Sequence, residues 1–357
     1  MIHRFFSFML PVLTVSFGLS SCSTQDSNKD KTEDAKLKES RRYDLSLRDR
    51  LEFFGKLPSV AESKENPITA EKVMLGYTLY YDNRLSANNT ISCNSCHNLA
   101  KFGVDGLQFS PGDAGKLGGR NSPTVLNAAF HATQFWDGRA KDVEEQAGMP
   151  VLNSVEMAIP NEKFLIDRLS KIELYKMLFA EAFPGEPNPI NYVNLRKAIA
   201  AFERQLISPS RLDKYLGGDS LALSVQEKKG MMSFALVGCT SCHNGALLGG
   251  NSFQKFGVYQ NYWEETQSAK HDEGRFEHTH NEADKYFFKT PSLRNVAETA
   301  PYFHDGSVKD LTRAVEIMAK VQLKYTLNEN EKANIVAFLK SLSGDIPENF
   351  KKSPVGL

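Results

Sequence analysis

Apolar residues recur along most of this chain with the spacing of a helical face, whereas the alternation typical of strands is scarce. Val73, Tyr77 and Tyr80 lie three or four positions apart and predict one face of a helix. Residues 224–227, Ser-Val-Gln-Glu, form a capping box and predict the start of another helix before Met231. The pattern therefore predicts an all-α fold.

The chain also repeats itself at a distance. A Pro-x-x-x-Asn segment occurs twice, and thirteen residues after each proline stands the variable position of a Phe-x-Asp-Gly motif. Trp136 occupies this position in the first copy and His304 in the second. The matched segments are 123–127 with 291–295, and 135–138 with 303–306. Internal repetition of this kind predicts two similar units packed together.

The first 45 residues have the pattern of an exported lipoprotein. A short basic end precedes an apolar run over residues 5–19, which is too short to span a bilayer comfortably and suits a signal peptide. Leu-Ser-Ser-Cys then resembles a bacterial lipobox, so we expect residues 1–22 to be a lipoprotein signal peptide ending at lipidated Cys22. Ordinary cleavage nearby is the alternative. Residues 23–45 are highly polar and predict a disordered tether.

Four of the five cysteines belong to two Cys-x-x-Cys-His runs, the spacing at which c-type haem is attached. The thiols form thioethers to the haem, and the histidine becomes an axial iron ligand. Disulfides or a zinc site are the alternatives, but neither explains a histidine after each pair. The residues are Cys93, Cys96, His97, Cys239, Cys242 and His243. They predict two covalent c-type haems, one in each of two cytochrome c-like domains, over residues 46–206 and 207–345.

The expected sixth iron ligands differ between the two halves. In the second half, Met318 lies on the helix predicted after residues 303–306, and its thioether would close the coordination of a haem that relays electrons. The alternative is that Met318 is a core residue. The repeat position in the first half is Pro150, which cannot ligate iron, and Met149 beside it is a weaker candidate. An open sixth position is where a haem can do chemistry.

Long segments of the chain resemble the bacterial di-haem cytochrome c peroxidases. The resemblance covers nearly everything after residue 46 and rests on segments 120–129, 134–140, 145–147, 155–157, 248–250, 288–296 and 299–306. It implies that the N-terminal haem reduces hydrogen peroxide and that the C-terminal haem accepts electrons from a small exported cytochrome c or a cupredoxin. It also implies that the tail, residues 346–357, returns to the first domain.

The same resemblance implies roles for individual residues. Gln146 and Glu156 fall on the positions above the peroxide-reducing haem, and Trp136 falls between the two haems. Glu156 would move a proton from one peroxide oxygen to the other, and Gln146 would donate a hydrogen bond to the developing charge. A calcium ion between the domains would be held by backbone carbonyls, those of Asn121, Thr299 and Pro301.

One position departs from the family pattern. Most members carry a histidine that closes the resting peroxide-reducing haem, seven residues before the arginine of Arg-Asn-Ser-Pro, and Asp113 stands there in this chain. We therefore expect the N-terminal haem to be open at rest. His131 is the nearest substitute ligand, but a structural role suits it better. Arg139 and Arg294 are candidates for contacts with haem propionates.

Two other functions stay open. One is an oxidase like the related di-haem enzyme of methylamine utilisation, which matures a partner protein but uses a tyrosine where this chain has Met318. The other is a non-enzymatic di-haem electron carrier, which would not need Gln146 and Glu156. Formal net charge is zero, with 43 basic and 43 acidic residues, which argues against a nucleic-acid partner. We expect a periplasmic, lipid-anchored peroxidase, and a homodimer is an open alternative.

Overall fold

The computed structural model describes residues 24–354 of a chain that divides into two compact units, one ending at Glu39 and the other beginning at Ser40. The described residues of the first unit all belong to helix α1 (Thr24–Leu47), whose last residues are part of the second unit. The predicted signal peptide and Cys22 lie outside the described residues. No helix in the described part of the chain is long and apolar enough to cross a bilayer.

The segment expected to be a disordered tether is helical from Thr24 onward. Lys, Glu and Ala have high helix propensity, so a stretch too polar to build a core can still form a helix. Ser40 and Leu47 are buried, and the Lys228 ammonium lies 2.6 Å from both the Ser40 hydroxyl and the Asp44 carboxylate. Residues 40–45 therefore belong to the second unit rather than to a disordered tether.

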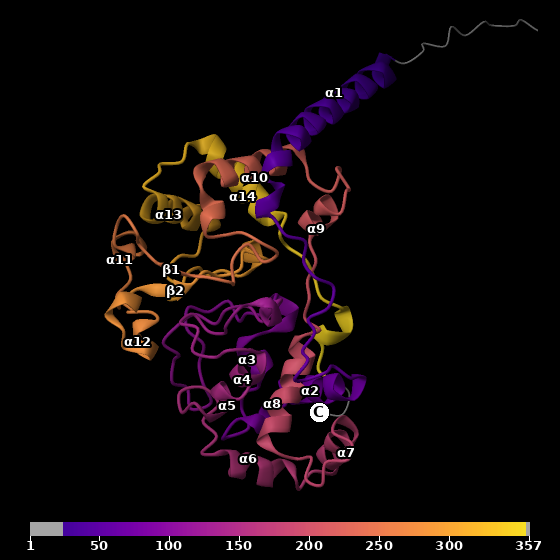
Figure 1. The fold of residues 1–357 in the computed structure, drawn as a ribbon, viewed down its shortest axis with the longest axis vertical. Helices are drawn as coiled ribbons and strands as arrows, with labels where there is room; N and C mark the ends of the chain where they lie inside the picture. The colour runs from indigo at the N-terminus through magenta and orange to yellow at the C-terminus, as the bar shows by residue number, and fades with distance from the viewer. Residues whose placement is uncertain (1–23, 355–357) are drawn as a thin grey trace, which may run out of the picture. The chain divides into compact units, whose positions relative to one another are not determined.

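The second unit is built mainly of helices, as the periodicity predicted (Figure 1). Thr69 caps α2, and Ser224 and Glu227 form the predicted capping box of α10, so both predicted helices are confirmed. The longer helices are α2 (Ala70–Tyr81), α6 (Glu162–Leu169), α7 (Glu173–Ala182), α8 (Tyr192–Glu203), α10 (Val225–Val237), α13 (Leu311–Leu323) and α14 (Glu329–Lys340). The shorter ones are α3 (Cys93–Cys96), α4 (Val143–Gln146), α5 (Met149–Leu152), α9 (Arg211–Leu216), α11 (Tyr262–Thr266) and α12 (Phe276–Thr279).

The described residues also contain a small antiparallel sheet. Strand β1 (Phe253–Lys255) pairs with β2 (Phe287–Lys289), and Phe253 lies opposite Lys289. The backbone N–H of Lys289 donates a hydrogen bond of 2.7 Å to the carbonyl of Trp136. The sheet therefore joins a segment of the second half of the chain to the first half, next to a residue predicted to be functional.

Helix α2 packs against α8, and α10 packs against α14 (Figure 1). Each pair makes a close approach at a glycine. In α2, Gly76 lies so close to α8 that a Cβ there would stand 1.9 Å from the carbonyl oxygen of Ala198. In α10, Gly230 lies in the same way against α14, where a Cβ would stand 1.8 Å from the carbonyl oxygen of Asn334. Only a residue without a side chain permits these approaches. The two crossings share one local geometry.

The repeated sequence segments also share their backbone geometry. Asn127 and Asn295 take φ values of 62° and 60°, and Phe135 and Phe303 take φ values of 67° and 70°. Left-handed φ values are uncommon for residues other than glycine, and especially for phenylalanine, so their recurrence at matched positions is specific. A backbone bridge follows in each copy, between Gln134 and Ala140 and between Tyr302 and Val308.

Each pair of crossing helices carries its own apolar core. Leu75 and Leu195 are fully buried in the core around α2, α7 and α8. Met231 and Phe338 are fully buried in the core around α10 and α14. Side chains from these crossings also reach the two cavities described below, so the packing of the helices helps to position the cavity walls.

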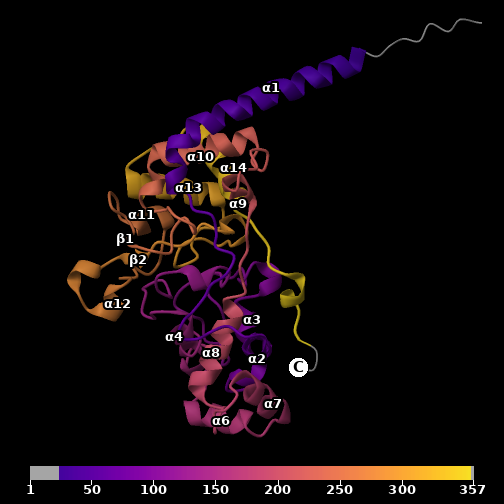
Figure 2. The ribbon, with the colours of Figure 1, turned by 45° about the vertical axis from the view of Figure 1, so that its right-hand side comes forward.

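The end of the described chain runs along the side of the molecule on which α2 lies (Figure 2), and it contacts side chains of α2 and α8. The Tyr77 hydroxyl donates to the Asn349 carbonyl at 2.6 Å, and the Tyr81 hydroxyl donates to the Phe350 carbonyl at 2.7 Å. The Phe350 ring packs edge-on against Phe202 of α8, with 5.2 Å between ring centres. This segment therefore covers one side of the first helix crossing.

Candidate functional site

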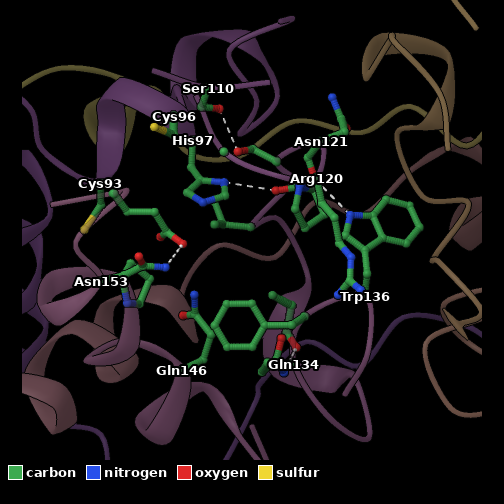
Figure 3. A pocket seen from close by; sticks show the side chains of 18 of the residues that line it. Cys93, Cys96, His97, Ser110, Arg120, Asn121, Gln134, Trp136, Gln146 and Asn153 are labelled. Carbon is green, nitrogen blue, oxygen red and sulfur yellow. Dashed lines mark hydrogen bonds between the residues drawn. The ribbon is translucent and has the colours of Figure 1, made fainter. Parts of the chain in front are cut away.

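A cavity of about 570 Å³ lies beside α3 and receives side chains from both halves of the chain. Ser92 and Ser95 form a capping box that starts α3 at Cys93. Residues three apart lie on one face of a helix, and Cys93 and Cys96 both line the cavity. Figure 3 shows these two cysteines and the His97 ring on one side of the cavity, with Gln146 across from them.

The His97 ring is oriented by a backbone carbonyl. Its Nδ1 lies 3.0 Å from the Pro123 carbonyl oxygen, which can only accept a hydrogen bond. Nδ1 therefore carries the proton, and Nε2 keeps the lone pair that an iron ligand needs. Burial lowers the pKa of His97, which favours the neutral ring that a metal requires.

A second cavity, of about 180 Å³, lies beside the other Cys-x-x-Cys-His run. Cys239 and Cys242 line it, and the His243 Nδ1 lies 3.0 Å from the Leu248 carbonyl oxygen. Burial lowers the pKa of His243 as well. Met318 of α13 lines the same cavity, so the structure brings together the residues that the sequence suggested as its two iron ligands.

Both cavities fit a covalently attached haem. Each has two unpaired thiols, a neutral histidine whose Nε2 is available and many apolar side chains in its walls. The four cysteines of the described residues form no disulfide. Within the same residues, no group of three or more His, Cys, Asp and Glu side chains could hold a metal such as zinc. The disulfide and zinc alternatives therefore lack support.

Gln146 and Glu156 both line the first cavity. Glu156 Oε1 accepts a hydrogen bond of 2.8 Å from the Asn153 side chain, which fixes the carboxyl group. Burial raises the pKa of Glu156, and the nearby charge of Arg139 only partly opposes this. Among the described residues, none hydrogen-bonds to the side-chain amide of Gln146, which leaves the amide available to a ligand in the cavity.

Trp136 lines both cavities. Its Nε1 donates a hydrogen bond of 2.9 Å to the carbonyl oxygen of Asn121, and the Asn121 N–H donates in turn to the carbonyl of His304 at 2.7 Å. The indole ring meets the His304 ring edge-on, with 6.4 Å between centres. His304 also lines the second cavity, so an aromatic pair lies between the two sites.

His131 and Met149 were the substitute ligands considered for the first cavity, and Asp113 stands in place of the usual histidine. His131 lines the cavity, but the Lys289 ammonium lies 2.8 Å from its Nδ1. When Lys289 is in its ammonium form it can only donate, so Nδ1 accepts and Nε2 of His131 carries the ring proton, which leaves no lone pair for iron. Met149 is 37% exposed and does not line the cavity, so it loses support as a ligand. Asp113 is buried, and its carboxylate is bound by residues outside the cavity lining.

The two arginines proposed to contact propionates have different surroundings. Arg139 lines the first cavity, where its guanidinium contacts Asp137 and stacks on Phe135. Arg294 is almost fully buried and lines neither cavity. Its guanidinium forms an ion pair with Asp213 at 2.5 Å, so the expectation for Arg294 was wrong. A buried arginine needs a carboxylate partner, and the sequence does not show which one it has.

The structure adds three residues that the sequence argument missed. Asn153 donates a hydrogen bond to the Glu156 carboxyl group. In the sequence, only its position three residues before Glu156 indicates this contact. Lys289 lines both cavities, and burial lowers its pKa to about 7. Glu203 of α8 lines the first cavity, and burial raises its pKa to about 8. In the sequence, Lys289 and Glu203 look like ordinary polar residues beside apolar segments.

Known proteins resemble this chain in sequence over most of its length. The profile of the family described as di-haem cytochrome c peroxidase matches residues 70–221. Cytochrome c551 peroxidase of Pseudomonas aeruginosa is 45% identical over 297 residues, which are 83% of this chain and 85% of that protein. The methylamine utilization protein MauG of Methylophilus methylotrophus is 32% identical over 309 residues, which are 82% and 88% of the two chains.

The fold has a solved counterpart. A MauG-like protein associated with microbial copper homeostasis superposes with a TM-score of 0.73 at 30% identity, over 84% of this chain and 96% of that one. Together with the two haem-binding runs and the peroxidase relatives, this shows both a family and a class of reaction. The chain belongs to the di-haem cytochrome c peroxidase family and is an oxidoreductase of the peroxidase class.

Proposed function

We propose that this chain reduces hydrogen peroxide to water in the first cavity, with electrons that a small c-type cytochrome or a cupredoxin delivers to the second. The observation that carries the proposal is that Gln146 and Glu156 line the same cavity as His97 and its two neighbouring thiols. Cleavage of an O–O bond needs a group that can take and return a proton, and Glu156 is such a group beside a site for iron.

The reaction consumes two electrons and two protons for each peroxide and releases two waters. A haem attached to Cys93 and Cys96 and ligated by His97 would supply the iron that takes up peroxide. Glu156 would take the proton of the nearer oxygen and deliver it to the departing one, and its raised pKa suits both steps. The Gln146 amide would donate a hydrogen bond to the oxygen on which negative charge develops.

Electrons would reach the first cavity through Trp136. This residue is supported as a bridge because its side chain contributes to the walls of both cavities. The second cavity would hold a haem between His243 and Met318, a ligand pair that raises the potential and suits electron transfer. That haem would relay electrons and would not bind peroxide.

We infer that two similar cytochrome c domains produce this arrangement, over residues 46–206 and 207–345, each with one covalent haem c. The matched crossings at Gly76 and Gly230 support an internal duplication. The contacts of Asn349 with α2 support the proposal that residues 346–357 return to the first domain.

We further propose one calcium ion between the domains, bound by the backbone carbonyls of Asn121, Thr299 and Pro301. The hydrogen bond from the Asn121 N–H to the His304 carbonyl supports this, because it brings Asn121 against the segment that contains the other two ligands. The Asn121 carbonyl already accepts from Trp136, so calcium would brace the proposed electron path.

The mature protein would be anchored by a lipid on Cys22 at the extracytoplasmic side of a bacterial membrane. The leader pattern of residues 1–22 and the two c-type haem sites support export, since c-type haem is attached outside the bacterial cytoplasm. Release of the protein from membranes by mild detergent, and its loss from membranes in a Cys22→Ser variant, would test the anchor.

The first haem would be open at rest, because Asp113 replaces the histidine that closes it in most relatives. Two measurements test the function together with this feature. The oxidised protein should bind cyanide, and it should oxidise a reduced small cytochrome c when peroxide is added. A protein that binds no small ligand in either the oxidised or the half-reduced state would overturn the proposal and leave an electron carrier.

A second function deserves a direct test because MauG proteins are among the relatives. An oxidase of that type would act on a partner protein rather than on a small cytochrome. Met318 in the wall of the second cavity argues against it, since a thioether ligand suits simple electron transfer. Peroxide turnover with a small cytochrome as the only reductant separates the two functions.

A further inference from the structure

The loop of residues 110–119 forms part of the wall of the first cavity and folds tightly on itself. Pro111 and Leu117 form an antiparallel bridge, and the Gly118 N–H donates to the Ser110 carbonyl at 3.0 Å. The loop contains four glycines, which give it many accessible conformations when nothing else holds it. Contacts with other segments must therefore select the observed conformation.

Asp113 supplies such contacts. Its Oδ2 accepts hydrogen bonds from the backbone N–H and the side-chain amide of Asn88, at 2.9 and 2.7 Å. Its Oδ1 accepts from the Thr90 hydroxyl at 2.6 Å. Burial opposes ionisation, but the hydrogen bonds from Thr90 and its neighbours outweigh it and lower the pKa of Asp113. The side chain is therefore a charged anchor outside the cavity.

The segment that Asp113 binds is itself firmly held. The buried Ser86 hydroxyl accepts from the Thr90 N–H at 3.1 Å, and the Ala87 N–H donates to the Met157 carbonyl at 2.8 Å. The Arg168 guanidinium also donates to the Ser86 carbonyl, at 2.7 Å. This segment leads directly into the first haem-binding run, so it is a fixed reference for the loop.

The same loop supports the proposed proton-transfer residue. The Asp113 N–H donates to the Glu156 carbonyl at 2.7 Å. Gly112 lies so close that a Cβ there would stand 1.8 Å from the Val155 carbonyl oxygen. The loop thus packs directly on the backbone that carries Glu156, while Asn153 fixes the Glu156 carboxyl group.

We propose that Asp113 is a positioning residue, which latches the 110–119 loop onto residues 88–90 and so holds the Glu156 backbone in the cavity wall before any electron has arrived. The inference rests on the proposed peroxidase function. A carboxylate suits this role because it accepts all three hydrogen bonds at once. A side-chain amide has a single acceptor oxygen and no charge, and a neutral imidazole has at most one acceptor, so neither accepts all three hydrogen bonds.

The test uses the full haem-loaded protein and two substitutions. Asp113→Asn keeps the size of the side chain but removes its negative charge and one acceptor oxygen, so the Thr90 hydroxyl can no longer donate to a carboxylate. Thr90→Val removes one hydrogen bond without changing the shape. In each variant we expect amide hydrogen exchange in residues 110–119 and 153–157 to become roughly 10-fold faster or more, as expected for the loss of a hydrogen bond to a charged group. The reaction of the oxidised protein with peroxide should slow by a similar factor.

Lys116→Ala is the matched control, because the Lys116 side chain is exposed on the same loop. It should change neither the exchange nor the reaction rate. The midpoint potential of the second haem should stay the same in all three variants, which shows that the rest of the protein is intact. Exchange is measured in the oxidised protein without peroxide, so it does not depend on activity.

The outcomes separate the latch from the function. Faster exchange and slower reaction in Asp113→Asn and Thr90→Val, with Lys116→Ala unchanged, would support the latch. Unchanged exchange in both variants of a protein that reacts with peroxide would overturn the latch and leave the peroxidase function intact. A parent protein that does not react with peroxide would overturn the proposed function. Faster exchange in the two variants would then still show that Asp113 holds the loop against residues 88–90.

Discussion

The Trp136 indole donates a hydrogen bond of 2.9 Å to the backbone carbonyl of Asn121, and this contact fixes the ring where it lines both cavities. The relationship joins a residue proposed for electron transfer to a residue proposed for calcium binding. Removing the ion should therefore loosen the ring, and changing the ring should leave the binding sites of both haems in place.

Trp136→Phe should slow electron transfer between the haems while both haem spectra stay unchanged. The shorter ring loses the hydrogen bond to Asn121 and fills less of the space between the cavities. We expect the reduction of the first haem to slow in stopped-flow experiments that start from a reduced donor. Unchanged transfer would show that electrons take another path. Treatment of the parent protein with a calcium chelator should produce a similar slowing.

Glu156→Gln should remove most of the peroxidase activity, by roughly 10²- to 10⁴-fold, because general acid–base catalysis is lost. The parent should lose activity as pH falls through the raised pKa of Glu156, since the carboxyl group must be ionised to accept a proton. This acid limb should lie above the usual glutamate range and should be absent from the residual activity of the variant. Cyanide binding and spectra provide the control for an intact haem.

Met318→Ala should lower the midpoint potential of the second haem and open its sixth position to water or added ligands. Both effects would follow from the loss of the Met318 thioether, which lines the same cavity as His243 and is the proposed second ligand of this iron. Potentiometric titration and the absorption spectrum of the oxidised protein would report the change. A variant whose second haem keeps its potential would show that Met318 is only a core residue.

Gly230→Ala should destabilise the fold by about 1 to 3 kcal/mol, because the new Cβ would stand 1.8 Å from the Asn334 carbonyl oxygen. The helices α10 and α14 would have to move apart. Gly119→Ala is the control, since nothing lies within 4 Å of the position of its Cβ. Thermal unfolding followed by circular dichroism measures both. Equal melting temperatures would mean that the crossing is less tight than described.

Glu203 should make the protein less stable as pH rises. Burial raises its pKa from 4.5 to about 8, so the folded state keeps a proton that the unfolded state releases. Between these two values the free energy of unfolding should fall by up to about 1.4 kcal/mol per pH unit, and above the higher value it should stay level. Glu203→Gln should flatten this part of the profile, as melting temperatures measured from pH 5 to 9 would reveal.

The sequence by itself determined where the two candidate haem-attachment runs lie, because covalent attachment needs two thiols and a histidine at a fixed local spacing. Residues 93–97 and 239–243 meet that condition whatever surrounds them. The start of α10 could also be predicted, since the capping box of Ser224 and Glu227 depends only on its own helical turn. The repeat was visible because both copies retain the same turn motifs.

Tertiary structure alone decided how distant residues meet. The pairing of Arg294 with Asp213 and the contact of Lys289 with both cavities depend on segments far apart in the chain. The helix in residues 24–47 arose where composition had suggested disorder. The three donors around Asp113 were equally hidden, because sequence shows which group is charged but not which donors reach it. The spacing of residues within a motif can be read from the sequence, whereas the burial of a side chain and its interaction partners are determined by tertiary packing.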